Sequence, residues 1–292
     1  MDGLAKASIL DIDGVAVPAE GDAFAAYSVR LLGSAVGVPT YSGACMRVRR
    51  DSDNVEADVG FDSNDELSLT SPISNTSDAQ SYTDFADFVD HTGTPANAFL
   101  RAWYDQSSNG YDAQQATATS QAQIYDGTAI TTDSNGNIAT KTGILMSATI
   151  PTTANDPFFT VFMSYATGRR EVVGLSATGG AFLNFEAGWN SGTQAKLIIG
   201  DGSTFASTSG TISSAPQVMT SYKLNDVSKL FSSSSQVGST LTDDLDNTTT
   251  TLEVGGRNKG GDGYISEVLV YTKDMTASQS TIVANLEAYY TV

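Results

Sequence analysis

Short strand-like segments separated by turns constrain the fold of this chain more than any other feature. Apolar residues alternate with polar ones over short stretches, and Gly, Ser, Thr, Asn and Asp fill the intervals between them. Such a pattern is typical of an all-β sandwich or barrel. The alternation in the last strand-like segment predicts one wetter and one drier face. The clearest segments are Cys45–Arg50, Ala98–Tyr104, Phe158–Tyr165, Gly180–Phe185, Val218–Leu224 and Tyr264–Tyr271.

Two segments have the period of a helix instead of a strand. In the first, Tyr82, Phe85 and Val89 share one stripe, Ser81 stands in the position of an N-cap, and Gly93 follows the end. This pattern predicts a short inserted helix over residues 81–90.

The second helical segment closes the chain, from Thr276 to Tyr290. Thr276 and Gln279 have the spacing of a capping box. We expect a C-terminal helix that lies across the sandwich and covers an exposed sheet edge. Its apolar face is predicted to consist of Ile282, Val283, Leu286, Tyr289 and Tyr290.

The 292 residues are expected to form one domain preceded by an arm. All-β sandwiches of this length fold as single units, and 40% of the residues are apolar, which is enough for a substantial core. Pro18 and Gly21 punctuate the start of the chain, so we expect an N-terminal arm over residues 1–22 and a sandwich domain over residues 23–292. The apolar runs are too short to span a bilayer, and no stretch has the pattern of a signal peptide.

Charge and residue counts exclude several functional classes. The net charge is −18, from 33 acidic and 15 basic residues, and a surface this negative repels a phosphate backbone, so we expect no nucleic-acid partner. Cys45 is the only cysteine and His91 the only histidine. An intrachain disulfide, a thiolate cluster and a multi-His zinc site are therefore excluded. His91 lies in a turn-like segment, where a solvated histidine is more common than a catalytic one.

The densest basic cluster is formed by Arg47, Arg49 and Arg50. Alternation places Arg47 and Arg49 on one face of a strand, where Asp51, Asp53 or Glu56 can pair with them. We interpret the cluster as an ion network, with an anion site as the alternative.

The two tryptophans differ in their surroundings. Trp103 lies within a strand and is expected in the core, and the segment 105–107 after it is expected to form a turn held by side-chain-to-backbone hydrogen bonds. Trp189 stands at the entrance to a loop. At that position it either stacks on a sugar ring or anchors the loop.

Three segments, taken in order, resemble the catalytic domain of the fungal α-L-arabinofuranosidase B family. The resemblance extends from about Phe24 to the C-terminus and implies a concanavalin A-like β-sandwich (jelly roll) of glycoside hydrolase type. Similar domains occur in tail-fibre and capsid-surface proteins of bacteriophages. The segments that carry the resemblance are residues 26–32 with 46–53 and 58–61, residues 103–110, and residues 254–256 with 263–271 and the terminal helix.

The resemblance also implies where catalytic carboxyl groups would lie. The family's nucleophile corresponds to Glu186, but Asn184 and Ala187 replace the flanking polar residues. The family's acid/base aspartate follows a Gly-Gly pair, and here Gly255-Gly256 is followed by Arg257. A guanidinium cannot donate a proton near neutral pH, so the site is expected to be disabled. Asp262 would be an alternative acid if the loop were rearranged. The candidate binding residues are Glu186, Trp189, Asn184 and Arg257.

Acidic loops at residues 11–14 and 243–246 could hold calcium, but neither has the full spacing of a known calcium loop. We expect no cofactor and no metal site.

These features favour a bacteriophage virion surface protein, structural and able to bind a host-surface glycan without catalysis. It would be a capsid decoration, a fibre or a tail-associated module. Other virion proteins would be its partners, with no membrane insertion, and it would form a homo-oligomer such as a trimer. An active retaining glycosidase that uses Glu186 is the alternative from another class, and a lectin-like sugar-binding module is a third reading.

Overall fold

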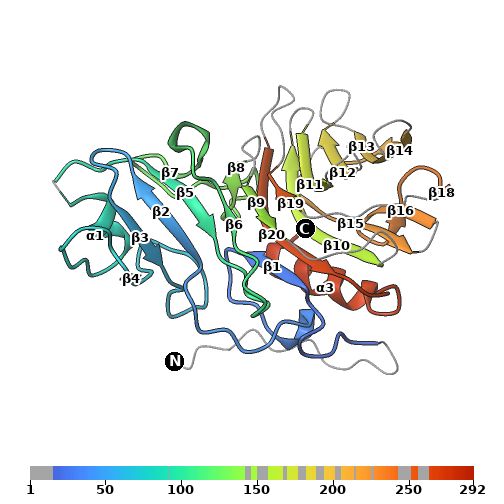
Figure 1. Ribbon diagram of the computed structural model, residues 1–292, viewed down its shortest axis with the longest axis horizontal. Helices are drawn as coiled ribbons and strands as arrows, with labels where there is room; N and C mark the ends of the chain where they lie inside the picture. Colours follow the sequence, from blue (N-terminus) through green and yellow to red (C-terminus); the bar gives the residue numbers. More distant parts are fainter. Residues whose placement is uncertain are drawn as a thin grey trace.

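The structure is a computed structural model that describes residues 16–91, 93–141, 146–149, 157–166, 170–176, 182–188, 194–200, 205–213, 215–224, 227–242, 251–255 and 263–292. In this part of the chain the strands form two antiparallel sheets, accompanied by a short inserted helix and a C-terminal helix (Figure 1). The predicted all-β sandwich is confirmed.

The smaller sheet contains both the first and the last strand of the described chain. Its order is β1 (Ala25–Ser28), β20 (Gly263–Tyr271), β10 (Phe158–Ala166), β15 (Gln217–Leu224), β16 (Val227–Ser232) and β17 (Ser235–Gln236), with β18 (Leu241–Thr242) paired to β16 and β8 (Thr140–Lys141) paired to β20.

The larger sheet is built from the remaining strands. Its order is β14 (Phe205–Thr211), β13 (Gln194–Gly200), β12 (Phe182–Gly188), β11 (Arg170–Ser176), β19 (Thr251–Val254), β9 (Met146–Thr149), β6 (Ala113–Gln114), β5 (Ala98–Trp103), β2 (Met46–Arg50), β3 (Glu56–Val59) and β4 (Ile73–Ser74), with β7 (Ala122–Tyr125) paired to β5. The helical elements are η1 (Ser34–Val36), α1 (Phe85–Val89), η2 (Ala118–Ser120) and α3 (Gln279–Tyr290).

The strand predictions hold within a few residues. Five of the predicted segments coincide with β2, β5, β10, β15 and β20 to within one or two residues at each end. The sixth, predicted to end at Phe185, continues as β12 to Gly188 because its pairing with β13 extends to Glu186 and Lys196.

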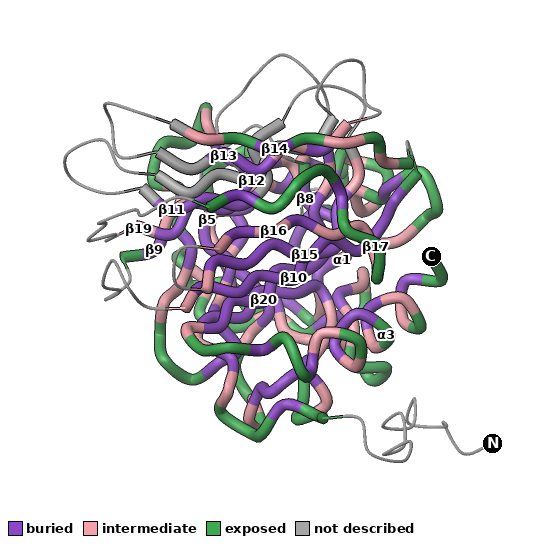
Figure 2. Tube along the Cα trace, turned by 90° about the vertical axis from the view of Figure 1, so that its right-hand side faces the viewer, coloured by how far each residue is buried: buried purple, intermediate pink, exposed green. Residues whose placement is uncertain are grey.

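Two apolar cores separate the layers. One lies between the sheets, where Val48 and Trp103 of the larger sheet meet Phe162 and Val268 of the smaller one. The other lies between the smaller sheet and α3, whose Leu286 packs with Phe159 of β10. Strands β10, β15 and β20 are therefore buried along most of their length (Figure 2).

Both helices start later than the sequence pattern predicts. Asp84, not Ser81, is the N-cap of α1, because its carboxylate accepts the backbone N–H of Asp87. The capping box predicted for the last helix is wrong. Thr276 donates its hydroxyl to Asp274, and α3 begins at Gln279.

The C-terminal helix also covers a face rather than a sheet edge. It packs against β10, β15 and η1, and β10 and β15 are interior strands of the smaller sheet. The predicted apolar stripe is confirmed at Ile282, Val283, Leu286 and Tyr290, which are buried.

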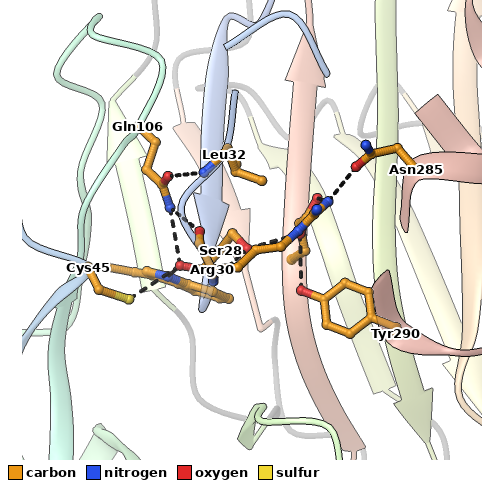
Figure 3. Close-up of polar contacts among 9 residues, drawn as sticks. Ser28, Arg30, Leu32, Cys45, Gln106, Asn285 and Tyr290 are labelled. Carbon is orange, nitrogen blue, oxygen red and sulfur yellow. Dashed lines mark hydrogen bonds and ion pairs between the residues drawn. The ribbon is translucent and has the colours of Figure 1, made fainter. Parts of the chain in front are cut away.

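Glu267 contradicts the expectation of a wetter face on the last strand. The larger sheet covers one face of β20 and α3 covers the other, so Glu267 is fully buried. Its carboxylate accepts two hydrogen bonds from Arg30, at 2.8 and 3.0 Å, one from Ser28 Oγ at 2.9 Å and one from Tyr290 Oη at 3.0 Å (Figure 3). The guanidinium of Arg30 also bonds Asn285 Oδ1 at 2.7 Å.

The carbonyl of Ser28 links the two sheets. It accepts hydrogen bonds from Trp103 Nε1 at 3.2 Å, Gln106 Nε2 at 3.3 Å and Cys45 Sγ at 3.3 Å. Gln106 Oε1 in turn accepts the N–H of Leu32 at 2.9 Å (Figure 3). Trp103 is 1% exposed, so its prediction as a core residue is confirmed.

The turn predicted after Trp103 is held by Asp105. Its carboxylate accepts the backbone N–H groups of Ala26 at 2.8 Å and Ser107 at 2.9 Å. Burial raises the pKa of the Cys45 thiol, which agrees with a structural role for this cysteine.

The described part of the N-terminal segment lies against the end of the chain. Asp22 pairs with Lys273, and the carbonyl of Ala16 accepts the hydroxyl of Thr281 at 3.0 Å. The division into an arm and a domain stays a prediction. No helix among the described residues is both long and apolar enough to cross a membrane.

Arg30→Met is expected to destabilise the fold by about 3–5 kcal/mol, because it leaves the buried Glu267 carboxylate without a cation. Urea unfolding would measure the loss. Lys273→Ala removes an exposed pair and should cost less than about 1 kcal/mol. A loss for Arg30→Met no larger than that of the control would contradict a structural role for the buried pair.

Thr220→Val is expected to stabilise the protein by about 1 kcal/mol, because the buried Thr220 hydroxyl has no hydrogen-bond partner in the described chain. Thr160→Val is the matched control, since Thr160 Oγ1 lies 2.7 Å from Ser221 Oγ. Removing that bond should lower the stability by about 1 kcal/mol. Thermal unfolding of both variants tests the pair, and equal shifts would refute the assignment.

Candidate functional site

The retained carboxylate of the family pattern lies on β12. Position 184 pairs with Gly174 of β11, and position 186 pairs with Glu171 of β11 and Lys196 of β13. The structure describes the backbone at Asn184 and Glu186. Trp189, Arg257 and Asp262 lie outside the described residues.

The connection that carries Arg257 begins near β12 in space. It follows β19, and β19 is separated from β12 by β11 alone. At the usual strand spacing the two strands are about 10 Å apart. Gly255, the last described residue before the connection, has a φ of 83°, a backbone conformation that favours glycine. The start of that connection therefore lies about two strand spacings from the strand that carries Glu186.

The ion network predicted around Arg47 is present on the same sheet. Arg47 Nε lies 2.8 Å from Glu56 Oε2, and Arg47 Nη1 lies 2.8 Å from Asp58 Oδ1. Arg101 approaches the other oxygen of Glu56 at 3.7 Å. The interpretation as an ion network is confirmed for Arg47, with Glu56 as the predicted partner and Asp58 as one that the pattern missed.

The other two arginines have different partners. Arg49 donates to the amide oxygens of Gln121 at 2.8 Å and Asn54 at 2.9 Å, so the carboxylate predicted for it is not its partner. Arg50 is buried and pairs with Asp53 at 2.7 Å. It also bonds the carbonyl of Phe88, which fixes α1 to the sheet.

The carboxylate of Asp58 accepts hydrogen bonds from three side chains. Besides Arg47, it accepts the hydroxyl of Tyr104 at 2.6 Å and the side-chain amide of Asn75 at 2.6 Å. Burial raises the pKa of Tyr104, and the hydrogen bond and charge of Asp58 add to this effect. With three partners, Asp58 serves to orient its neighbours rather than to attack a substrate.

Asp112 is a carboxyl group near Asp105 and Asp58 whose surroundings oppose its ionisation. Burial raises the pKa of Asp112, the N–H of Asp105 partly opposes the rise, and the charges of Asp105 and Asp58 strengthen it. The sequence did not single out Asp112, because its burial and the charge of Asp58 depend on contacts with distant segments, although Asp105 is only seven positions away. Asp58 could have been found, since it stands two residues beyond Glu56 on the same strand.

No group of three or more His, Cys, Asp or Glu residues in the described ranges could hold a metal ion. The two acidic loops considered for calcium, residues 11–14 and 243–246, lie outside those ranges.

Solved structures of glycosidases share this fold. A GH54 α-L-arabinofuranosidase variant soaked with 4-nitrophenyl α-L-arabinofuranoside superimposes with a TM-score of 0.59 and 16% identity, over 90% of this chain and 63% of that protein. An arabinofuranosidase complexed with arabinofuranosyl-α-1,2-xylobiose gives a TM-score of 0.54 at 17% identity, over 90% of this chain and 62% of that one. This chain therefore spans less than two thirds of the length of those proteins.

The sequence matches no model of a known protein family, and no curated protein matches it. At 16–17% identity the structural likeness shows the fold. The resemblance to the arabinofuranosidase B catalytic domain that the sequence motifs predicted is confirmed at that level.

Relative to wild type, Asp112→Asn is expected to stabilise the protein more at pH 7 than at pH 4. Because the pKa of Asp112 is raised in the folded state, the native protein holds this proton more tightly than the unfolded chain, whose aspartates titrate near 3.9. The protonated carboxyl group therefore stabilises the native protein at low pH, and this stabilisation is lost as the pH rises. Asparagine keeps the oxygen that accepts the N–H of Asp105 and carries no charge.

Thermal unfolding of wild type and Asp112→Asn at both pH values would measure the difference. Asp126→Asn, at an exposed loop carboxylate whose backbone hydrogen bonds lower its pKa, should change stability in the opposite sense. A gain for Asp112→Asn that is the same at both pH values would contradict the assignment.

Proposed function

We propose that this protein is a non-catalytic, glycan-binding structural module on the surface of a bacteriophage particle, as a capsid decoration, a fibre or a tail-associated part. The observation that carries the proposal is the arginine at position 257. It directly follows the Gly255-Gly256 pair of a glycosidase fold, where the resemblance implies a carboxyl group.

Retaining glycoside hydrolysis needs two carboxyl groups about 5 Å apart, one as nucleophile and one as acid/base. Arg257 stays protonated at neutral pH and cannot supply the second. Glu186 alone can accept hydrogen bonds from sugar hydroxyls, and Asn184 can both donate and accept. This combination supports binding without cleavage.

The charge of the chain agrees with a surface role. A net charge of −18 favours solubility at high local concentration and disfavours contact with nucleic acid. In the proposal the partners are other virion proteins and a host-surface glycan, and the module acts as a homo-oligomer, with a trimer as one arrangement.

An active α-L-arabinofuranosidase is the second candidate. It is supported by the fold of the two arabinofuranosidase structures and by the glutamate on β12. Under this reading Asp262, or another carboxyl group, would act as the acid with Glu186 as nucleophile.

An assay with 4-nitrophenyl α-L-arabinofuranoside separates the two candidates. The proposal predicts no turnover above the uncatalysed rate for wild type, and about tenfold weaker glycan binding for Glu186→Gln, the cost of one hydrogen bond to a charged group. Glu20→Gln, at an exposed position of the N-terminal segment, is the control and should bind as wild type does. Turnover that Glu186→Gln abolishes would overturn the non-catalytic proposal.

Immunogold electron microscopy of purified phage particles tests the location. Labelled particle surfaces are expected. Unlabelled particles would remove the virion proposal and leave the glycan-binding part to be judged by the assay above.

A further inference from the structure

Arg49 and Lys141, together called the cation pair below, have no carboxylate partner in the part of the chain that the structure describes. Arg49 donates to Gln121 Oε1 at 2.8 Å and to Asn54 Oδ1 at 2.9 Å. Lys141 Nζ donates to Gln123 Oε1 at 3.3 Å. All of these acceptors are neutral amides, so both positive charges remain uncompensated by their direct contacts.

The register brings the cation pair together over β7. Arg49 reaches Gln121, the residue before β7, across β5, and Lys141 reaches Gln123 from β8. The two glutamines lie two positions apart, about 7 Å along the strand, and project to the same face. Ala122 between them belongs to the core between the sheets. The cation pair therefore converges on the outer face of the larger sheet.

The carboxylates on this part of the sheet are engaged elsewhere. Glu56 lies opposite Arg49 in the register, but its two oxygens contact Arg47 at 2.8 Å and Arg101 at 3.7 Å. Asp58 also pairs with Arg47. Two arginines are thus matched by two carboxylates, and the cation pair is left with a local excess of two positive charges.

Two further carboxylates border the area without pairing with it. Asp126, whose charge interacts with that of Lys141, accepts two backbone N–H groups of its own turn at 2.9 Å. Asp51 accepts the side-chain amide of Asn97 at 2.8 Å. Like charges that face each other on a sheet repel, and an anion bound between them would relieve that repulsion.

The cation pair lies on a surface that water reaches. Lys141 is exposed, and Arg49, Phe99 and Gln123 are half-buried. The guanidinium carbon of Arg49 lies 5.2 Å from the centroid of the Phe99 ring, which holds the side chain against the sheet. Its hydrogen bonds use Nε and Nη1, so the N–H groups of Nη2 are available to a ligand.

The backbone here offers nothing to an extended peptide. Strand β5 lies between β2 on one side and β6 and β7 on the other, so its edges are already paired. A peptide cannot add as a further strand, and a ligand is recognised by side chains alone. Gln114 of β6 is exposed on the same face, and its amide can both donate to and accept from hydroxyl groups.

The charge of the whole chain limits the size of the ligand. The net charge of −18 repels a long anionic polymer. At about 0.15 M salt, however, charges more than about 8 Å away are largely screened. A single carboxylate placed between Arg49 and Lys141 therefore interacts mainly with the local positive excess.

We propose that Arg49 and Lys141 bind the carboxylate of an acidic sugar, a uronic acid residue, on the outer face of the larger sheet. The guanidinium supplies directed donors, the ammonium a second charge, and Gln114 an amide for the sugar hydroxyls. Strand β2 is six strand intervals, about 29 Å, from β12. The site is thus separate from Glu186 and goes beyond the proposed function.

Titration calorimetry with trigalacturonic acid and with its fully methyl-esterified form tests the proposal, because esterification removes the charges and keeps the sugar backbone. Wild type should bind the acid at least tenfold more tightly than the ester. Arg49→Gln and Lys141→Gln should each weaken binding of the acid by about tenfold and leave binding of the ester unchanged. Lys273→Gln, at an exposed lysine near α3, is the matched control and should bind as wild type does.

Because Lys141 is exposed, Lys141→Gln should keep the unfolding temperature of wild type, which separates lost binding from lost folding. The proposal is refuted if wild type does not bind the acid, if acid and ester bind equally, or if both variants bind the acid as wild type does. Triglutamate is the peptide probe, and binding as tight as that of trigalacturonic acid would overturn the assignment to a sugar. None of these outcomes changes the arabinofuranoside assay of Glu186→Gln, so the two proposals fail separately.

Discussion

The buried ion pair between Arg30 and Glu267 holds the architecture together. Two charges removed from water are costly unless geometry and further hydrogen bonds compensate. Here the guanidinium and carboxylate meet through two parallel bonds, and Ser28 and Tyr290 bond the same carboxylate. The ring of Tyr289 lies 4.4 Å from the guanidinium carbon. The segment after β1, the last strand and the last helix are thereby joined at one point (Figure 3).

The same segment also connects the smaller sheet to the larger one. Ser28, two residues before Arg30, accepts hydrogen bonds through its carbonyl from Trp103 of the larger sheet and from Cys45. The inner face is thus fixed against the smaller sheet, and α3 covers the far side of that smaller sheet. In the described residues the polar groups around Arg47 lie on the face that neither packing surface uses.

The sequence predicted the elements that depend on local pattern. Alternation located β2 and β20, and Trp103 was expected in the core because it lies within a strand. The last helix was placed too early, because Thr276 bonds Asp274 instead of capping a helix. The burial of Glu267 was not predictable from its neighbours, since its cation is 237 positions away in the chain.

The candidate site was likewise predictable only where the information lies in a local pattern of the sequence. Glu186 and Arg257 stand in motifs that can be read along the chain, and the pairing of Arg47 with Glu56 follows from strand alternation. The larger sheet joins strands whose order in the sheet differs from their order in the sequence. Long-range pairing of this kind leaves no periodic signal in the sequence.

The central claim, which rests on the proposed function, is that the protein binds a glycan without cleaving it. Backbone amide NMR of the protein titrated with an arabinoxylan oligosaccharide tests this claim residue by residue, while the sugar signals report any cleavage. The account predicts shifts in β12 and its neighbour β11, little change in β10 and β15, and an intact oligosaccharide. Shifts confined to the smaller sheet, or new reducing-end signals from the sugar, would contradict it.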